Sequence, residues 1–292
     1  MSASDEALSG VATARFVDLH AHSTASDGAA TPSALVAAAR QVGLAAIALT
    51  DHDTIGGVRE AVSAAAGTDL RVVPGVELSA VDASGETHVL GLHLCDFDAL
   101  DARLAELRDM RRTRAERIVQ RLNALGVRVT MDDVLEQAAG GAIGRPHVAR
   151  ALIANGWAAD ARTAFDRYLA AGRPAFVAKD RLSLADAIGM VHRAGGIAVL
   201  AHPGASATPE RLKALAALGL DGVEVRHPSH DDAEVGRILA LTERLGLVPS
   251  GGSDWHGLPD GARALGAMRV PADWLARQDA RIARRRSREW VA

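Results

Sequence analysis

Short, largely apolar segments recur along this chain of 292 residues, and most of them end at histidine or acidic residues. Clear examples cover residues 16–19, 44–49, 197–201, 222–225 and 247–250. Segments of this length and apolarity are typical of strands that are buried on both faces. Stretches with the signals of a helix start lie between them, so the order of elements predicts an α/β fold built on a parallel sheet or barrel. A site in such a fold lies at the carboxyl ends of the strands.

The helix signals support this alternation. Thr31 and Thr208 are each followed by proline, which is the usual order of an N-cap and a first helical residue. Ser183 and Asp160 are the expected N-caps of two further helices. We therefore expect helices to connect the strands on both sides of a central stretch, residues 99–180, in which the strand signals are missing.

The first apolar segment ends in His20-Ala-His22. Residues i and i+2 of an extended chain lie on the same face, so both imidazoles project from the end of this strand toward one point. Two neutral imidazoles at the open end of a strand are suitable ligands for a borderline divalent metal. The alternative is that His20 packs in the core and His22 is an ordinary loop residue.

Further ligand-type residues follow the later strands. Together with the histidine pair, the candidate metal ligands are His20, His22, Asp27, His52, Glu77, His88, His202, Asp254 and His256. Each of them alone has an ordinary structural explanation, such as a capped turn or a core histidine. Their shared position, at or just beyond the ends of successive strands, predicts one common metal site. Nitrogen and oxygen ligands without sulfur favour Mn, Zn or Fe over a structural zinc site.

The central stretch, residues 99–180, is interpreted as a helical insertion, with a long Arg-bearing helix over 99–125 and three shorter helices after it. Its arginines are most simply a solvated helix face. Arg145-Pro-His147 differs, because it follows a Gly-rich turn and begins a helix, where backbone N–H groups favour anions. It is therefore either a phosphate clamp or a simple helix start with a surface arginine.

Composition excludes several classes of protein. A net charge of −3 and an aromatic content of 3% leave little basis for binding long nucleic acids by charge or stacking. A single cysteine, Cys95, excludes an internal disulfide and a cysteine-based zinc site. The first fifteen residues lack the pattern of a signal peptide, and no apolar run reaches membrane-spanning length. We therefore expect a cytoplasmic protein without membrane contact and without an obligate protein partner.

Five motifs, taken in order, resemble the PHP (polymerase and histidinol phosphatase) superfamily. They are Val17–Ser23, Thr50–Asp53, Pro74–Glu77, His202-Pro203 and Gly252–His256, and the resemblance covers residues 15–98 and 185–270. It implies an α/β fold, a distorted (β/α)7 TIM-like barrel formed by residues 14–98 and 181–285, with residues 99–180 as the insertion domain. Arg145–His147 and residues 224–230 resemble the branch of phosphoesterases that act on nucleoside 3′,5′-bisphosphates and RNA 5′ ends.

The resemblance also implies two to three divalent metals, with Mn expected first and Zn, Fe or Mg as alternatives. One metal would be held by His20, His22, Glu77 and Asp254; a second by Glu77, His88 and His202; a third by Asp27, His52 and His256. Asp51 and Asp53 are expected to orient neighbouring histidines. His93, near the second set, is expected to be structural.

The function implied is hydrolysis of a phosphate monoester of a small nucleotide, such as a nucleoside 3′,5′-bisphosphate, by a metal-bridging hydroxide, with trimming of RNA 5′ ends as a second activity. The expected phosphate or substrate contacts are Arg145, His147, Lys179 and Arg226, and the expected catalytic residues are Arg226, His227 and His230, either histidine protonating the leaving oxygen. The alternatives are a histidinol-phosphate phosphatase, an amidohydrolase-type reaction and a noncatalytic metal-binding module.

Overall fold

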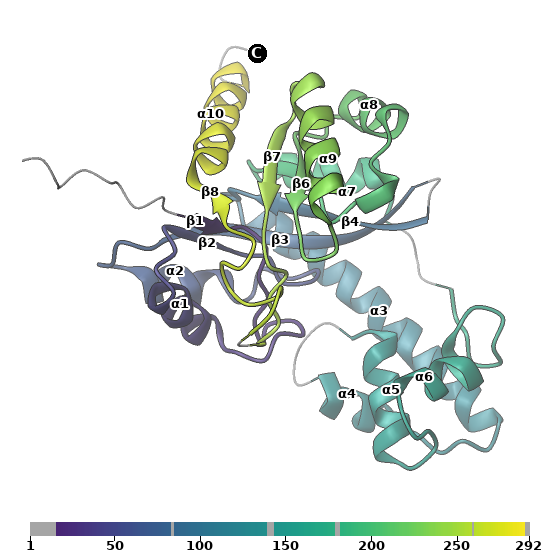
Figure 1. The fold of residues 1–292 in the computed structure, drawn as a ribbon. Coiled ribbons are helices and arrows are strands. Elements are labelled where there is room, and N and C mark those ends of the chain that lie inside the picture. Colours follow the sequence, from purple (N-terminus) through teal and green to yellow (C-terminus); the bar gives the residue numbers. More distant parts are fainter. Residues whose placement is uncertain (1–15, 83–84, 139–142, 179–181, 259, 290–292) are drawn as a thin grey trace, which may run out of the picture.

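Eight strands form one sheet that curls into a nearly closed barrel in this computed structural model, which describes residues 16–82, 85–138, 143–178, 182–258 and 260–289 (Figure 1). Their order across the sheet is β7-β6-β5-β4-β3-β2-β1-β8. Their bounds are β1 (Phe16–Asp18), β2 (Ala46–Leu49), β3 (Arg71–Asp82), β4 (Gly85–Leu92), β5 (Ile197–Leu200), β6 (Gly222–Arg226), β7 (Val248–Gly251) and β8 (Val270–Pro271). The ends of β1 and β7 also meet, because the Leu19 N–H donates to the Gly251 carbonyl at 3.0 Å. The predicted barrel is confirmed.

The distortion of the barrel lies at β4, which runs antiparallel to both of its neighbours, β3 and β5. Strand β8 is also antiparallel to β1, whereas the pairs β1–β2, β2–β3, β5–β6 and β6–β7 are parallel. Strand β3 continues through Pro74 and changes partner there: it pairs with β2 as far as Pro74 and with β4 from Gly75 onward.

Helices connect the strands and cover the barrel. Their bounds are α1 (Pro32–Gln41), α2 (Val58–Ala65), α3 (Asp98–Ala124), α4 (Met131–Ala138), α5 (Arg145–Ala154), α6 (Ala161–Ala164), α7 (Leu184–Arg193), α8 (Pro209–Ala217), α9 (Asp232–Arg244) and α10 (Ala272–Glu289), with a π-helical turn at Phe165–Leu169 and a 3-10 turn at Gly204–Ser206. The four expected N-caps are confirmed: the side chains of Thr31, Asp160, Ser183 and Thr208 accept N–H groups of the first turn. None of the helices in the described ranges combines the length and apolarity needed to cross a bilayer.

Helix α3 belongs to two apolar cores. Its first half places Leu100, Leu104 and Leu107 in the core of the barrel, whereas Ile118 and Leu122 pack in a second cluster with α4, α5 and α6. Figure 1 shows α3 leading away from the barrel to these smaller helices, which lie to one side of it. We keep residues 99–180 as the proposed insertion, with α3 as the rigid element that joins both cores.

Candidate metal centre

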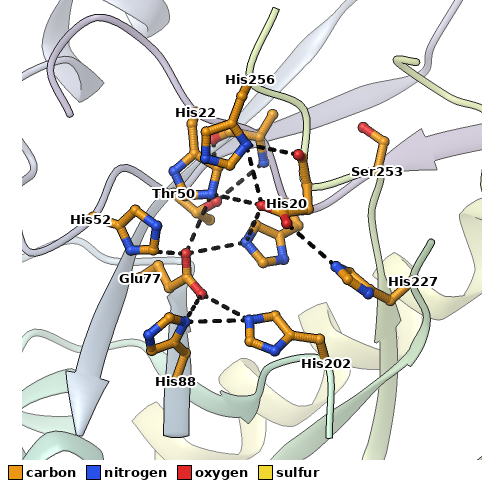
Figure 2. Close-up of polar contacts among 12 residues, drawn as sticks. His20, His22, Thr50, His52, Glu77, His88, His202, His227, Ser253 and His256 are labelled. Atoms are coloured by element: carbon orange, nitrogen blue, oxygen red, sulfur yellow. Dashed lines mark hydrogen bonds and ion pairs between the residues drawn. The ribbon is translucent and has the colours of Figure 1, made fainter. Parts of the chain in front are cut away.

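The carboxylate of Glu77 lies at the centre of a ring of imidazoles at one end of the barrel (Figure 2). Glu77 is on β3 and is 1% exposed. One of its oxygens, Oε2, lies 3.3 Å from Nε2 of both His20 and His22 and 3.1 Å from Nδ1 of His52. The other, Oε1, lies 2.7 Å from Nδ1 of His88 and 3.2 Å from Nε2 of His202. A carboxylate in this position can bridge two cations.

The other predicted ligands complete the cluster. Asp254 Oδ1 lies 3.2 Å from His22 Nε2, and Asp27 Oδ1 lies 3.2 Å from His256 Nε2. The rings of His22 and His256 stack with their centroids 4.2 Å apart. The structure therefore brings all nine predicted ligand residues together, although they come from chain segments more than 200 residues apart.

The nitrogen and oxygen atoms of this cluster are arranged to bind divalent metals rather than to form hydrogen bonds with one another. Four groups of three or four His, Asp and Glu residues have ligand atoms within 4.8 Å of each other. Both ring nitrogens of His22 are buried and make no well-aligned hydrogen bond with a described residue, although Nε2 lies within 3.3 Å of carboxylate oxygens of Glu77 and Asp254. Nδ1 of His88 and Nε2 of His202 are 3.3 Å apart, and both also approach Glu77. Such converging lone pairs are satisfied by cations, and the nitrogen and oxygen donors suit Mn, Zn or Fe.

The charges of the cluster are strongly coupled. Burial lowers the pKa of His22, but Asp254 and Glu77 outweigh it and raise this pKa to about 9. Burial raises the pKa of Glu77, yet His52 and His20 hold it well below the usual value. The pKa of His52 is lowered to about 4, chiefly by burial. The carboxylates therefore stay ionised, and protons compete with metals for some of the imidazoles.

The local backbone conformation directs the side chains of the cluster toward one another. His202 and Asp254 have φ angles of 28° and 50°, in the left-handed region that non-glycine residues rarely adopt. A Cβ atom at Gly252 would lie 2.4 Å from the Cβ of His20, so only glycine allows β1 and the segment after β7 to approach this closely. These strained turns at strand ends are consistent with a functional site.

Two buried acidic residues, Glu224 and Asp18, accept hydrogen bonds from groups around the cluster. Neither was predicted as a site residue. Glu224 Oε1 accepts from Nδ1 of His20 at 2.9 Å, and its Oε2 accepts from the backbone N–H of His202 at 2.7 Å. Asp18 accepts from the backbone N–H groups of Ser253 and Gly266, both at 2.9 Å. The sequence signal that could have indicated Glu224 and Asp18 is an acidic residue within an apolar strand segment. A buried charge requires a hydrogen-bonding or charged partner.

Asp51 and Asp53 do not orient histidines as expected. The Asp51 carboxylate accepts from the backbone N–H and the hydroxyl of Ser23, both at 2.7 Å, and from the hydroxyl of Ser26 at 2.6 Å. Asp53 accepts from the backbone N–H of Ser79 and from the guanidinium of Arg111 on α3. These aspartates therefore shape loops around the site, and Asp53 ties α3 to the barrel.

The predicted catalytic residues lie in three different environments. Arg226 donates to the carbonyls of Met268 and Arg269, at 3.1 and 2.8 Å, away from the cluster. His230 uses both ring nitrogens on the backbone: Nδ1 donates to the Val225 carbonyl at 2.9 Å, and Nε2 accepts from Gly204 N–H at 3.0 Å. His227 alone faces the cluster.

The tautomer of His227 follows from its neighbours. Its Nδ1 accepts from the backbone N–H of Ser229 at 3.1 Å, so the proton of the neutral ring lies on Nε2. That nitrogen is buried, 3.5 Å from Asp254 Oδ2. His93 is the histidine that was expected to be structural. Its Nε2 lies 3.2 Å from Oε1 of Gln278, and the described residues show no contact between His93 and Glu77.

A cavity of about 260 Å³ opens beside the cluster, between the barrel and the predicted insertion, and we call it the arginine cavity. Its lining includes Asp27, His52, Arg111, Arg114, Arg145 and His147. The Arg145 guanidinium lies over the rings of Phe165 and Phe176. His147 accepts the Gly144 N–H at its helix start, and burial lowers its pKa to about 4. Lys179, another of the predicted phosphate contacts, lies outside the described residues.

Comparison with known proteins agrees with this geometry. The PHP domain pattern matches residues 18–199. The chain belongs to the PHP family. It is 37% identical to the 3′,5′-nucleoside bisphosphate phosphatase of Chromobacterium violaceum, over 86% of this chain and 90% of that protein. It is 36% identical to the 5′-3′ exoribonuclease Rnm of Escherichia coli, over 82% of this chain and 84% of that protein.

A solved structure extends the comparison to the whole fold. A metal-dependent phosphoesterase from Bifidobacterium adolescentis is 35% identical, with a TM-score of 0.79, covering 92% of this chain and 96% of that one. This PHP protein is accordingly a metal-dependent enzyme that hydrolyses phosphoric esters. These relatives do not favour the histidinol-phosphate alternative.

The role of Glu224 in this PHP site can be tested with Glu224→Ala. The change leaves two buried donors unpaired, His20 Nδ1–H and the His202 N–H, and removes the support for the left-handed backbone of His202. We expect metal affinity to fall by about 10- to 100-fold, as for other residues that orient metal ligands. Titration calorimetry with Mn²⁺ measures this change. Unchanged affinity would contradict the positioning role.

Proposed function

We propose that this enzyme removes the 3′-phosphate of nucleoside 3′,5′-bisphosphates. The observation that carries the proposal is the position of the arginine cavity: three arginines line a cavity that adjoins the cluster through Asp27 and His52. A substrate with one phosphate at the metals and a second phosphate among arginines fits this arrangement. The Chromobacterium violaceum relative is named for action on such a substrate.

Two to three divalent metals, with Mn expected first, would be held in the three sets implied by the family resemblance. His20, His22, Glu77 and Asp254 form the first; Glu77, His88 and His202 the second; Asp27, His52 and His256 the third. Such ions supply Lewis acidity to a phosphoryl group and lower the pKa of water toward neutrality. Glu77 belongs to two of these sets, so its carboxylate would fix the positions of the two metals relative to each other.

The side chains of the arginine cavity would bind and orient the second phosphate. Arg145 is held by two aromatic rings, which leaves a planar, fixed guanidinium at the cavity wall. Arg111 is anchored by Asp53 and by the hydroxyl of Ser79 at 3.0 Å. Arginines that are fixed before binding lose little conformational entropy when a phosphate arrives.

His227 is the proposed source of the proton for the leaving oxygen. Proton donation requires the imidazolium form, because a neutral ring that lost its Nε2 proton would become an imidazolate. In the imidazolium, Ser229 Oγ, which lies 2.7 Å from Nδ1, can accept the Nδ1 proton, while the buried Nε2–H points into the cluster. Arg226 is not included, because its Nη1 donates to the carbonyls of Met268 and Arg269 and its guanidinium lies over the ring of Trp274. His230 is not included, because backbone groups occupy both of its ring nitrogens.

The test compares adenosine 3′,5′-bisphosphate with 3′-AMP, which lacks the second phosphate, on the Mn-loaded enzyme. Arg145→Ala is expected to lower kcat/KM for the bisphosphate by about 10- to 100-fold, the value of a charge-assisted contact, and to change 3′-AMP turnover little. Arg167→Ala is the matched control, because this exposed arginine lies over the ring of Tyr168, outside the lining of the cavity.

Two outcomes would contradict the proposal. One is an equal loss of both activities in Arg145→Ala, which would place Arg145 outside the recognition of the second phosphate. The other is a wild-type preference for histidinol phosphate or 5′-AMP over the bisphosphate. A metal-stripped sample of each protein shows whether the release depends on metal.

A further inference from the structure

Arg263 lies between β7 and β8 and contacts a candidate metal ligand. Its Nη1 donates to Oδ2 of Asp254 and, at 3.3 Å, to the Asp254 backbone carbonyl. Among the ion pairs of the described residues, all other partners of the candidate carboxylate ligands, Asp27, Glu77 and Asp254, are histidines. Arg263 is not among the residues that line the arginine cavity. The cluster therefore has a cationic neighbour outside that cavity.

The chain segment that carries Arg263 is fixed on both sides of this residue. The Gly266 N–H donates to Oδ2 of the buried Asp18 at 2.9 Å, and Nε1 of Trp255 donates to the Leu258 carbonyl at 2.7 Å. Figure 1 shows the segment leaving the end of β7 and returning to β8. The position of Arg263 beside Asp254 is therefore set by the fold.

The two carboxylate oxygens of Asp254 face different groups. Oδ1 lies 3.4 Å from Nε2 of His20 and 3.2 Å from Nε2 of His22, both in the first proposed metal set. Oδ2 accepts from Arg263 and lies 3.5 Å from Nε2 of His227, the proposed proton donor. Arg263 and His227 therefore meet at the oxygen of Asp254 that does not face these two imidazoles.

The guanidinium of Arg263 keeps donors available for a ligand. Its side chain is 42% exposed, and only Nη1 has hydrogen-bond partners among the described residues. Nε and Nη2 remain, and they form an edge of the guanidinium that matches two oxygens of a phosphate. The bond from Nη1 to Asp254 holds this edge in place before a ligand arrives, which lowers the entropy cost of binding.

An anion is the ligand that suits this position. Without one, Arg263 would face the positive charge of cations held on the Oδ1 side of Asp254, only one carboxylate away. A phosphoryl group placed between the guanidinium and these cations attracts both. The reaction supplies such a group, because a phosphate bound for hydrolysis lies at the metals.

We propose that Arg263 is a catalytic residue whose Nε and Nη2 donate to nonbridging oxygens of the phosphoryl group that is removed. In the hydrolysis a water oxygen joins phosphorus, the P–O3′ bond breaks and O3′ takes a proton, while the charge of the transition state is spread over the nonbridging oxygens. Arg145 would bind the phosphate that stays on the nucleoside. The inference deepens the proposed function and rests on it only for the position of the transferred phosphate.

The first test compares adenosine 3′,5′-bisphosphate with 3′-AMP on the Mn-loaded enzyme, because both carry the phosphate that is removed. Arg263→Ala is expected to lower kcat/KM for both substrates by the same factor, at least about a hundredfold, since an arginine strongly stabilises the charge of this transition state. Arg263→Lys keeps the charge but lacks the planar edge, so a smaller loss is expected. Arg277→Ala is the matched control: this arginine on α10 is 39% exposed and pairs with Glu243 at 3.3 Å.

The second test separates phosphate binding from support of Asp254. Titration calorimetry measures the binding of Mn²⁺ to the metal-stripped proteins and then of inorganic phosphate to the Mn-loaded proteins. In Arg263→Ala, the Mn²⁺ affinity is expected to stay within about fivefold of wild type, as for a partly exposed ion pair. The phosphate affinity is expected to fall about tenfold or more, the value of a charge-assisted hydrogen bond.

Three results would overturn the inference. One is a phosphate affinity of Arg263→Ala equal to that of wild type. Another is a loss of turnover with the bisphosphate alone, which would place Arg263 at the second phosphate. The third is a fall in Mn²⁺ affinity that explains the whole effect, with wild-type turnover at saturating Mn²⁺. A wild type that prefers histidinol phosphate or 5′-AMP contradicts only the proposed function, and the phosphate titration still decides the role of Arg263.

Discussion

Glu77→Gln is expected to abolish metal-dependent phosphate release, with a loss of about a thousandfold or more in kcat/KM, because a bridging ligand supports several kcal/mol of transition-state stabilisation. Glu77 is the residue on which the cluster converges: its two oxygens approach five imidazoles within 3.3 Å. Glutamine keeps the volume of the side chain but removes its charge and one acceptor oxygen, so two cations can no longer share it.

The measurement combines phosphate release with the metal content of the purified protein by mass spectrometry. Glu60→Gln is the control, since this exposed glutamate on α2 accepts hydrogen bonds from the backbone N–H and the hydroxyl of Ser33 and lies outside the cluster. Normal turnover by Glu77→Gln with a full metal complement would exclude the bridging role and the assignment of the three sets.

Asp18→Ala is expected to destabilise the fold by about 3 kcal/mol, since each buried donor that loses its acceptor costs about 1–3 kcal/mol. Asp18 is fully buried on β1, next to the seam where the barrel closes. Its carboxylate accepts from Ser253 and Gly266, both at 2.9 Å, and from His20 N–H at 3.4 Å. Alanine leaves these N–H groups unsatisfied and loosens the segment that carries Asp254.

The midpoint of urea unfolding, followed by circular dichroism on metal-free protein, measures this loss without interference from metal binding. Asp109→Ala on the exposed side of α3 is the control, and a change within about 0.5 kcal/mol is expected for it. If Asp18→Ala unfolds at the same urea concentration as wild type, the buried carboxylate does not hold the seam.

The alternation of strands and capped helices, and the position of the candidate ligand residues at the strand ends, were predictable from the sequence because both depend on local patterns. The spacing in His20-Ala-His22 predicts that both imidazoles lie on one face of an extended segment, wherever that segment lies in the fold. Thr31 and Ser183 cap helices through bonds that span three residues. Family motifs extended this local information to the closed barrel, since His20 and Asp254 belong to motifs at opposite ends of the chain.

Contacts between distant segments were decided only by the tertiary structure. Glu224 reaches His20 across 204 residues, and no local pattern distinguishes it from an acid on a strand surface. The same limit explains His230 and Arg226, whose residue types suited catalysis. Backbone groups occupy both ring nitrogens of His230, and Nη1 of Arg226 donates to two backbone carbonyls. Which side chains face the arginine cavity depends on how α3 packs on the barrel. Sequence therefore determined which residue types stand at the strand ends, whereas packing decided which of their charges are paired and which side chains line the cavity beside the cluster.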